Sequence, residues 1–166
     1  MRLIVMRHAK AEQAAPNDFE RALTERGRAD ARAAGAWLAG RGWVPDHALV
    51  SAATRTRETF EGVAAGGDFS VQPDLDRSLY SAAPESVVDL VRLVPSEVRN
   101  LLLIGHNPTM GSLAQLLHDG TGDEDAITEM AGDFPTGALA LLEHDGAWAD
   151  LAWTSCSLAG FHVARG

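Results

Sequence analysis

The hydrophobic and polar positions follow two periods along the chain, and the change between them predicts strands that alternate with helices. Short apolar runs with β-branched residues predict strands at 2–6, 47–51 and 100–105, and a weaker one at 69–72. Apolar residues at helical spacing predict helices after Thr24, over 54–65, from Pro84 and after Pro108. Thr24 has the side chain of an N-cap residue.

The last third of the chain carries a different pattern. The acidic, glycine-containing stretch 119–135 predicts a loop with a short helix. Two apolar segments, 137–144 and 148–155, flank Asp145-Gly146, a dipeptide typical of hairpin turns. We therefore expect an α/β protein with a single domain over residues 1–166. The fold expected is a three-layer α/β/α sandwich with a mostly parallel, mixed sheet and a C-terminal hairpin.

Composition narrows the functional classes. A chain of 166 residues with 46% hydrophobic residues can bury a sizeable core. The net charge of −9 gives no support to a nucleic-acid or anionic-membrane partner. Cys156 is the only cysteine, which excludes an intrachain disulfide and a multi-cysteine zinc site. No apolar run reaches the roughly 20 residues of a membrane span, and no signal-peptide pattern opens the chain, so we expect a cytoplasmic protein.

Cationic and titratable side chains follow the predicted strands. Arg7 and His8 come after the first, Arg55 follows the second, and His106 and Asn107 follow the run at 100–105. The carboxyl ends of parallel strands meet at one edge of a sheet, where ligands collect. Arginine forks match phosphate oxygens, and a neutral imidazole is a nucleophile near pH 7. The sequence therefore predicts an anion site with a reactive histidine.

These motifs resemble those of the histidine phosphatase superfamily, also called phosphoglycerate-mutase-like. The elements that carry the resemblance are Arg7-His8-Ala9, SAATRTRET at 51–59 and LLIGHNP at 102–108. The short length and the stretch DFERALTERG at 18–27 look most like the SixA-type phosphohistidine phosphatases. Two positions depart from the family pattern: Ala9 stands in place of the usual glycine and Ala52 in place of the usual proline.

The resemblance implies a role for each matching residue. His8 would attack phosphorus through Nε2 and form a covalent phosphohistidine, while a backbone carbonyl holds its Nδ1–H. The side chains that would clamp the phosphoryl oxygens are Arg7, Arg55 and His106, and those that would contact the substrate are Arg21 and Asn107. The resemblance implies no metal and no other cofactor.

The general acid has no clear match. Larger family members carry a carboxylate after the third strand, but in residues 75–86 none fits convincingly, which leaves Glu85 and Asp18 as candidates. An alcohol leaving group needs a proton, and general acid catalysis typically supplies about 10²- to 10⁴-fold in rate. A phosphoramidate leaves from a nitrogen that can itself be protonated. The missing acid therefore favours phosphohistidine over a phosphomonoester.

Three alternatives stay open from the residues alone. The protein could act on small phosphomonoesters, as phosphoglycerate-mutase-like enzymes do. It could be a metal-dependent hydrolase with His8 and His106 as ligands, or a non-catalytic phosphate-binding module. The partner expected is a phosphorylated protein or a small phosphorylated metabolite, with no nucleic acid and no membrane.

Overall fold

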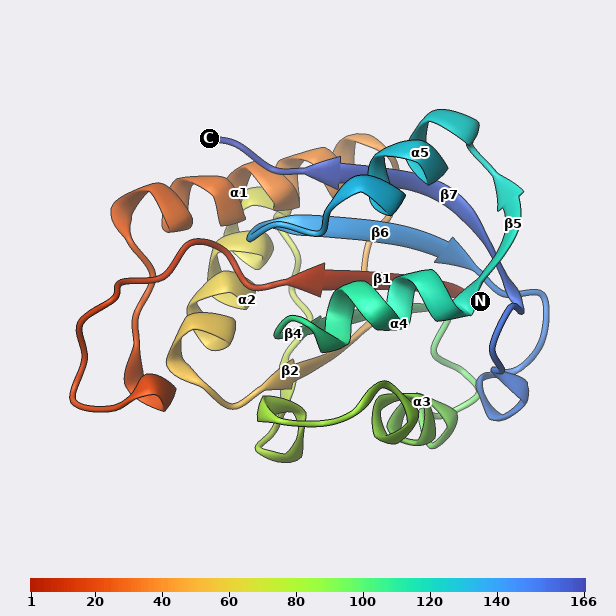
Figure 1. Ribbon diagram of the computed structural model, residues 1–166, viewed down its shortest axis with the longest axis horizontal. Coiled ribbons are helices and arrows are strands. Elements are labelled where there is room, and N and C mark those ends of the chain that lie inside the picture. Colours follow the sequence, from red (N-terminus) through yellow and green to blue (C-terminus); the bar gives the residue numbers. More distant parts are fainter.

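The computed structural model describes residues 1–166 and shows one mixed sheet with helices on both faces (Figure 1). The strands are β1 (Arg2–Arg7), β2 (His47–Ser51), β3 (Pro73–Asp76), β4 (Asn100–Gly105), β5 (His118–Gly122), β6 (Ala138–Glu143) and β7 (Cys156–Val163). The helices are α1 (Glu25–Gly40), α2 (Thr54–Gly67), α3 (Pro84–Arg92), α4 (Thr109–Leu117) and α5 (Glu124–Gly132). Three single-turn 3₁₀ helices are η1 (Asp18–Glu20), η2 (Ser78–Tyr80) and η3 (Trp148–Asp150).

The sheet has seven strands in the order β3-β2-β4-β1-β6-β7-β5. Strands β1 to β4 run parallel, and β6 runs antiparallel to both of its neighbours, β1 and β7. β5 pairs parallel with β7, so β6 is the one strand that runs against the others. The mostly parallel, mixed sheet is confirmed, and β4 lies inside it as its apolar sequence predicts.

Side chains of β1 point alternately to two apolar layers. Leu3 and Val5 pack with residues of α3, α4 and α5, whereas Ile4 and Met6 pack with residues of α1 and α2. Because helices cover both faces, every interior position of the strand is apolar, which explains its continuous hydrophobic run. This arrangement confirms the three-layer α/β/α sandwich.

Helices α1 and α2 lie very close together and hold the cationic side of the site. Thr24 caps α1 as predicted, since its Oγ1 accepts a hydrogen bond from Gly27 N at 2.9 Å. A Cβ on Gly35 would come within 2.0 Å of the Val63 carbonyl oxygen, so only glycine permits this approach of the two backbones. The contact fixes the direction of α2, whose first turn carries Arg55.

The third strand lies later in the chain than predicted. The apolar pattern placed it at 69–72, but β3 begins at Pro73, which pairs with Ala48. Phe69 and Val71 pack instead against the core layer of α1 and α2, so their hydrophobic character reflects burial in a connection and not in a strand.

The predicted C-terminal hairpin is correct in kind but wrong in its second strand. β6 pairs antiparallel with β7, yet β7 starts at Cys156 and the predicted segment 148–155 contains η3. The Trp148 indole is buried and donates a hydrogen bond to Val98 O at 2.9 Å, which draws this segment into the core. Asp145-Gly146 therefore lies in a longer connection. β5 was also missed, because His118–Gly122 has no apolar pattern.

None of the helices combines the length and the apolar character that crossing a membrane requires.

Candidate active site

The two candidate histidines lie side by side at the carboxyl edge of the sheet. β1 and β4 are adjacent and parallel, with Arg7 in register with Gly105, so the residues that follow them, His8 and His106, emerge together. The amide of His8 donates to Gly105 O at 3.0 Å and extends the ladder by one step. The two imidazole ring centres are 5.3 Å apart, which confirms the predicted meeting of the two strand ends.

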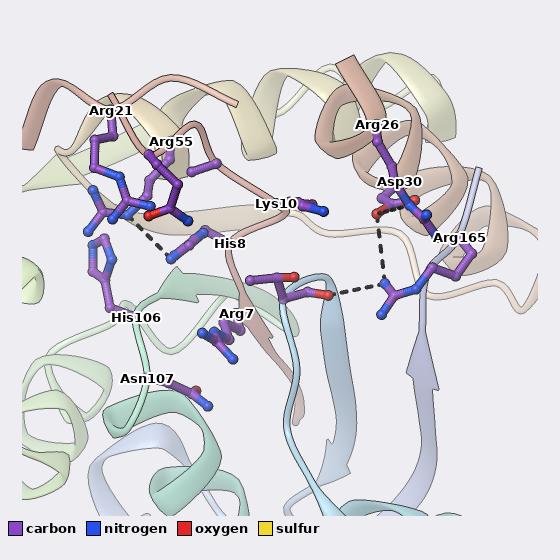
Figure 2. A pocket seen from close by; sticks show the side chains of 13 residues that line it. Arg7, His8, Lys10, Arg21, Arg26, Asp30, Arg55, His106, Asn107 and Arg165 are labelled. Atoms are coloured by element: carbon purple, nitrogen blue, oxygen red, sulfur yellow. Dashed lines mark hydrogen bonds and ion pairs between the residues drawn. The ribbon is translucent and has the colours of Figure 1, made fainter. Parts of the chain in front are cut away.

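His8 has one imidazole nitrogen held by the backbone and the other directed into the site. Its Nδ1 lies 2.7 Å from Ala9 O, an oxygen that can only accept, so Nδ1 carries the proton. Nε2 then has the lone pair and accepts a hydrogen bond from Arg55 Nε at 3.3 Å (Figure 2). Burial lowers the pKa of His8 to about 4, and nearby arginines act in the same direction. His8 is therefore neutral near pH 7, the form that a nucleophile requires.

Ala9 fits the backbone that follows His8. Asp68 and Thr154 are the non-glycine residues with positive φ, so Ala9 adopts a conformation open to any L-residue. The Ala9 amide donates to Thr59 Oγ1 at 3.0 Å, and the side chain is buried. Alanine in place of the usual glycine thus introduces no backbone strain beside His8.

Asp18 holds the Arg55 side chain in place. Arg55 Nη1 donates to the backbone oxygen of Asp18 at 2.7 Å, and Nη2 donates to its carboxylate at 3.1 Å. Tyr80 OH also donates to this carboxylate, and Arg21 Nη1 does so at 2.9 Å. The hydrogen bond from Tyr80, and then that from Arg21, hold the pKa of Asp18 well below its usual range. An ionised carboxylate has no proton to give, so the geometry fits Asp18 as a partner of Arg55 and not as the general acid.

Glu85, the other candidate acid, lies apart from the site. It is exposed in the first turn of α3 and does not line the cleft that contains His8. Neither carboxylate singled out from the sequence is therefore placed and protonated as an acid near Nε2.

Arg7 and Asn107 share one backbone acceptor. Arg7 Nη1 donates to Phe134 O at 3.1 Å, and Asn107 Nδ2 donates to the same oxygen at 2.8 Å. The carbonyl thus fixes two polar side chains from neighbouring strand ends. Arg21 reaches the site from the loop before α1, where its Nε donates to Glu12 O at 2.6 Å.

His106 forms a hydrogen bond with a side chain to which the sequence assigned no role. Its Nε2 lies 2.8 Å from Oγ of Ser51, the fully buried last residue of β2, and its Nδ1 has no partner. Burial lowers the pKa of His106 to about 3, and His8 and Arg55 reinforce the shift. Both imidazoles are therefore neutral near pH 7. The sequence feature that could have pointed to Ser51 is its position at the end of a predicted strand.

The two histidines, the three arginines and Asn107 described above line one cleft of about 540 Å³ (Figure 2), whereas Asp18, Ser51 and Tyr80 do not line it. Its thirteen lining residues are Arg7, His8, Lys10, Ala11, Gln13, Arg21, Arg26, Asp30, Arg55, His106, Asn107, Thr136 and Arg165. The cleft brings together all six residues expected to bind or transfer the phosphoryl group. The cleft also contains a set of charged side chains around Asp30 that was not predicted from the sequence.

The sequence and the structure both match one family. Residues 3–80 match the sequence profile of the histidine phosphatase superfamily (branch 1). The structure of a protein assigned as the phosphohistidine phosphatase SixA from Nakamurella multipartitia superposes with a TM-score of 0.88 at 31% identity, over 99% of this chain and 96% of that one. The chain belongs to the SixA-type group of the histidine phosphatase superfamily. This membership makes it a phosphatase.

Other relatives of this SixA-type protein cover nearly its whole length. A protein of Agrobacterium tumefaciens, also assigned as SixA, has 32% identity and a TM-score of 0.77 over 97% of this chain and 96% of its own. The uncharacterized protein Rv1276c of Mycobacterium tuberculosis is 37% identical over 96% of this chain and all of its own.

The described residues contain no group of three or more His, Cys, Asp and Glu side chains that could hold a metal ion. A metal site built on His8 and His106 would thus lack a third ligand of these types.

Proposed function

We propose that the protein hydrolyses phosphohistidine on other proteins through a covalent intermediate on His8. The observation that carries the proposal is the state of the His8 imidazole. Nδ1–H is fixed on Ala9 O, Nε2 bears the lone pair, and Arg55 donates to that same nitrogen. An incoming phosphoryl group would find the nucleophile and a cation side by side, which is what phosphoryl transfer requires of a protein.

The first step transfers the phosphoryl group to His8. As the phosphoryl group enters, Arg55 Nε exchanges its hydrogen bond to Nε2 for one to a phosphoryl oxygen, which frees the Nε2 lone pair. Nε2 then forms the bond to phosphorus while the bond from phosphorus to the substrate nitrogen breaks, and the electron pair of that bond returns to the substrate imidazole. If the other nitrogen of that ring carries a proton, the leaving group is neutral imidazole. Arg7 and Arg55 offset the charge of the phosphoryl oxygens, and an anion bound beside His106 favours its protonated form.

The second step releases phosphate. Water attacks phosphorus, the bond to Nε2 breaks, and the electron pair returns to His8 as its lone pair. The proton that water loses passes to phosphate or solvent. Since Nδ1–H stays on Ala9 O throughout, His8 also leaves as a neutral imidazole. The two steps therefore expel the same kind of leaving group, and neither needs a carboxylic acid.

The absence of a placed acid supports a nitrogen-linked phosphoryl group. Asp18 is held ionised by its partners and Glu85 lies outside the cleft, so neither candidate carboxylic acid is placed to protonate an alkoxide. A phosphomonoester with a poorly leaving alcohol would lack the factor of about 10²–10⁴ that an acid supplies.

Rapid-quench experiments with a ³²P-labelled phosphohistidine protein test the covalent step. We expect label on the enzyme that is lost in acid, survives alkali and maps to His8. His8→Ala should abolish both the adduct and turnover, and His144→Ala, a buried histidine outside the cleft, serves as the control. Unchanged turnover in His8→Ala, with no adduct, would end the proposal.

A series of leaving groups tests the substrate class. We expect rapid turnover of a phosphohistidine peptide, slower turnover of nitrophenyl phosphate and very slow turnover of glycerol phosphate, because the rate depends on leaving-group basicity when no acid assists. Rates should persist in EDTA. Faster hydrolysis of glycerol phosphate than of the peptide would favour the small-phosphomonoester alternative.

A further inference from the structure

The cleft continues beyond the proposed phosphoryl site to a second group of cations. Lys10, Arg26 and Arg165, here called the distal cluster, line the cleft around Asp30. In Figure 2 Arg26 and Arg165 lie on the side of the cleft opposite Arg21, Arg55 and His106. Arg26 comes from the first turns of α1, and Arg165 comes from the segment after β7.

Asp30 lies beside the two arginines of the distal cluster. Its side chain is only 3% exposed, and its carboxylate lies 3.7 Å from Arg165 Nη1 and 4.0 Å from Arg26 Nε. The same carboxylate accepts a hydrogen bond from Gly166 N at 3.0 Å. The buried carboxylate therefore lies within ion-pair distance of two guanidinium groups at the cleft wall and offsets part of their charge.

The Arg165 guanidinium makes all its protein contacts through Nη1, which leaves its other two nitrogens available to a ligand. Its Nη1 donates to Thr136 O at 3.1 Å and to Ala164 O at 2.6 Å, and the contact with Asp30 uses this nitrogen too. Nε and Nη2 donate to no protein group. A guanidinium fixed in this way loses little further entropy when it binds a ligand, and two free N–H directions suit an anionic oxygen pair.

The charge around the cleft exceeds what one phosphoryl group needs. Six of the chain's fourteen Lys and Arg residues line it, in a protein of net charge −9. Two carboxylates offset them: Asp30, which lines the cleft, and Asp18, which pairs with Arg21 and Arg55. Its volume of about 540 Å³ lies within the range of about 300–1,000 Å³ for pockets that hold whole small ligands. One lining residue, Ala11, is apolar. The cleft is therefore suited to a polar, strongly anionic ligand that is larger than phosphate.

We propose that the distal cluster binds a second anionic group of the substrate, a carboxylate or phosphate, while the phosphoryl group lies against His8. For a phosphohistidine protein this group is an acidic side chain close to the phosphorylated histidine. The inference rests on the proposed function for its choice of substrate. The binding chemistry it assigns to Arg26 and Arg165 applies equally to a small phosphorylated acid.

Matched peptides test the inference. Two phosphohistidine peptides that differ only by Glu against Gln near the phosphorylated residue are compared on the wild-type protein and on Arg26→Gln/Arg165→Gln. We expect KM about twofold to fivefold lower for the Glu peptide with nearly equal kcat, because an exposed ion pair contributes uniform binding. The double variant should lose this difference and keep its turnover of the Gln peptide.

Arg32→Gln is the matched control. Arg32 is exposed on the same helix as Arg26, forms no side-chain hydrogen bond or ion pair, and lies outside the cleft, so Arg32→Gln reports the effect of losing one positive charge on the protein surface. We expect it to retain the preference for the Glu peptide. Thermal unfolding of each variant at one ionic strength shows whether it is folded.

The results separate the two proposals. Equal KM for both peptides on the wild type, or a preference that persists in the double variant, overturns the proposed role of the distal cluster and leaves the proposed function intact.

If neither peptide is hydrolysed, the proposed substrate class fails instead. The distal cluster is then tested by inhibition of nitrophenyl phosphate turnover. Stronger inhibition by 3-phosphoglycerate than by glycerol 3-phosphate, lost in the double variant, supports a small phosphorylated acid, and equal inhibition overturns the inference.

Discussion

Replacing Asp18 by Asn separates a partner of Arg55 from a general acid. The carboxylate receives Arg55 on one oxygen and Arg21 on the other, and the Arg55 side also receives Tyr80. An amide has one acceptor oxygen and presents an NH₂ group to the other side, where it faces a donor. Asp18→Asn therefore loses one of the two guanidinium contacts whichever way the amide turns.

The expected loss follows from the number and exposure of these bonds. A hydrogen bond to a charged group contributes about 1.5–3 kcal/mol when buried, but the Asp18 side chain is 52% exposed and solvent screens much of this. We expect about 1–2 kcal/mol of lost transition-state stabilisation, which is roughly a 5- to 30-fold decrease in kcat/KM. Because Arg55 acts on the phosphoryl group, the factor should be similar for every leaving group.

The assay compares kcat/KM of wild type and Asp18→Asn on a phosphohistidine peptide, nitrophenyl phosphate and glycerol phosphate. Glu20→Gln is the control, since Glu20 is an exposed acid of the same 3₁₀ turn and its side chain forms no hydrogen bond or ion pair. A loss confined to glycerol phosphate would refute the reasoning and identify Asp18 as the acid. An increase in kcat/KM would also refute it, because Asp18 would then compete with phosphate for Arg55.

Three further predictions concern the buried polar groups. His8 and His106 stay neutral in the fold down to about pH 4 and about pH 3, but are protonated below about pH 6.5 when unfolded. The free energy of unfolding measured in urea should therefore be at its full value above pH 7. It should fall by up to about 1.4 kcal/mol per pH unit for each histidine as pH decreases from 6.5 to 4. His8→Gln should show a shallower dependence of this free energy on pH. Ser51→Ala should cost about 1–3 kcal/mol of unfolding free energy, because it leaves His106 Nε2 buried without its partner; no change in the urea midpoint would contradict this. Thr59→Val should cost a similar amount by orphaning the Ala9 amide, and Thr59→Ser should restore the melting temperature.

The parts of the fold that the sequence predicts are those governed by local periodicity. β2 and β4 were placed at their observed bounds, since continuous apolar runs arise wherever helices cover both faces of a sheet. β5 could not be found in this way. Its residues are almost all exposed, and two of its glycines have positive φ, so its pairing with β7 comes from the tertiary structure.

The features of the site also differ in whether the sequence predicts them. His8 and His106 each directly follow a recognisable strand, and parallel pairing makes their meeting predictable. Asp30 and Arg165 belong to elements at opposite ends of the chain and meet only because β7 returns beside α1. The ionised state of Asp18 was equally inaccessible, because its largest cause is the hydrogen bond from Tyr80, a residue far along the chain whose proximity no spacing rule encodes.

The hydrogen bond from His8 N to Gly105 O has an evolutionary consequence. The separation of the two imidazoles is set by backbone pairing between β1 and β4, which depends little on side-chain identity. The loop before α1, by contrast, supplies Lys10, Ala11, Gln13 and Arg21 to the cleft wall, and the segment after β7 supplies Arg165. Mutations there can alter which phosphorylated molecule is accepted without moving the reacting atoms. New specificities can therefore arise on this sheet while its chemistry is inherited unchanged.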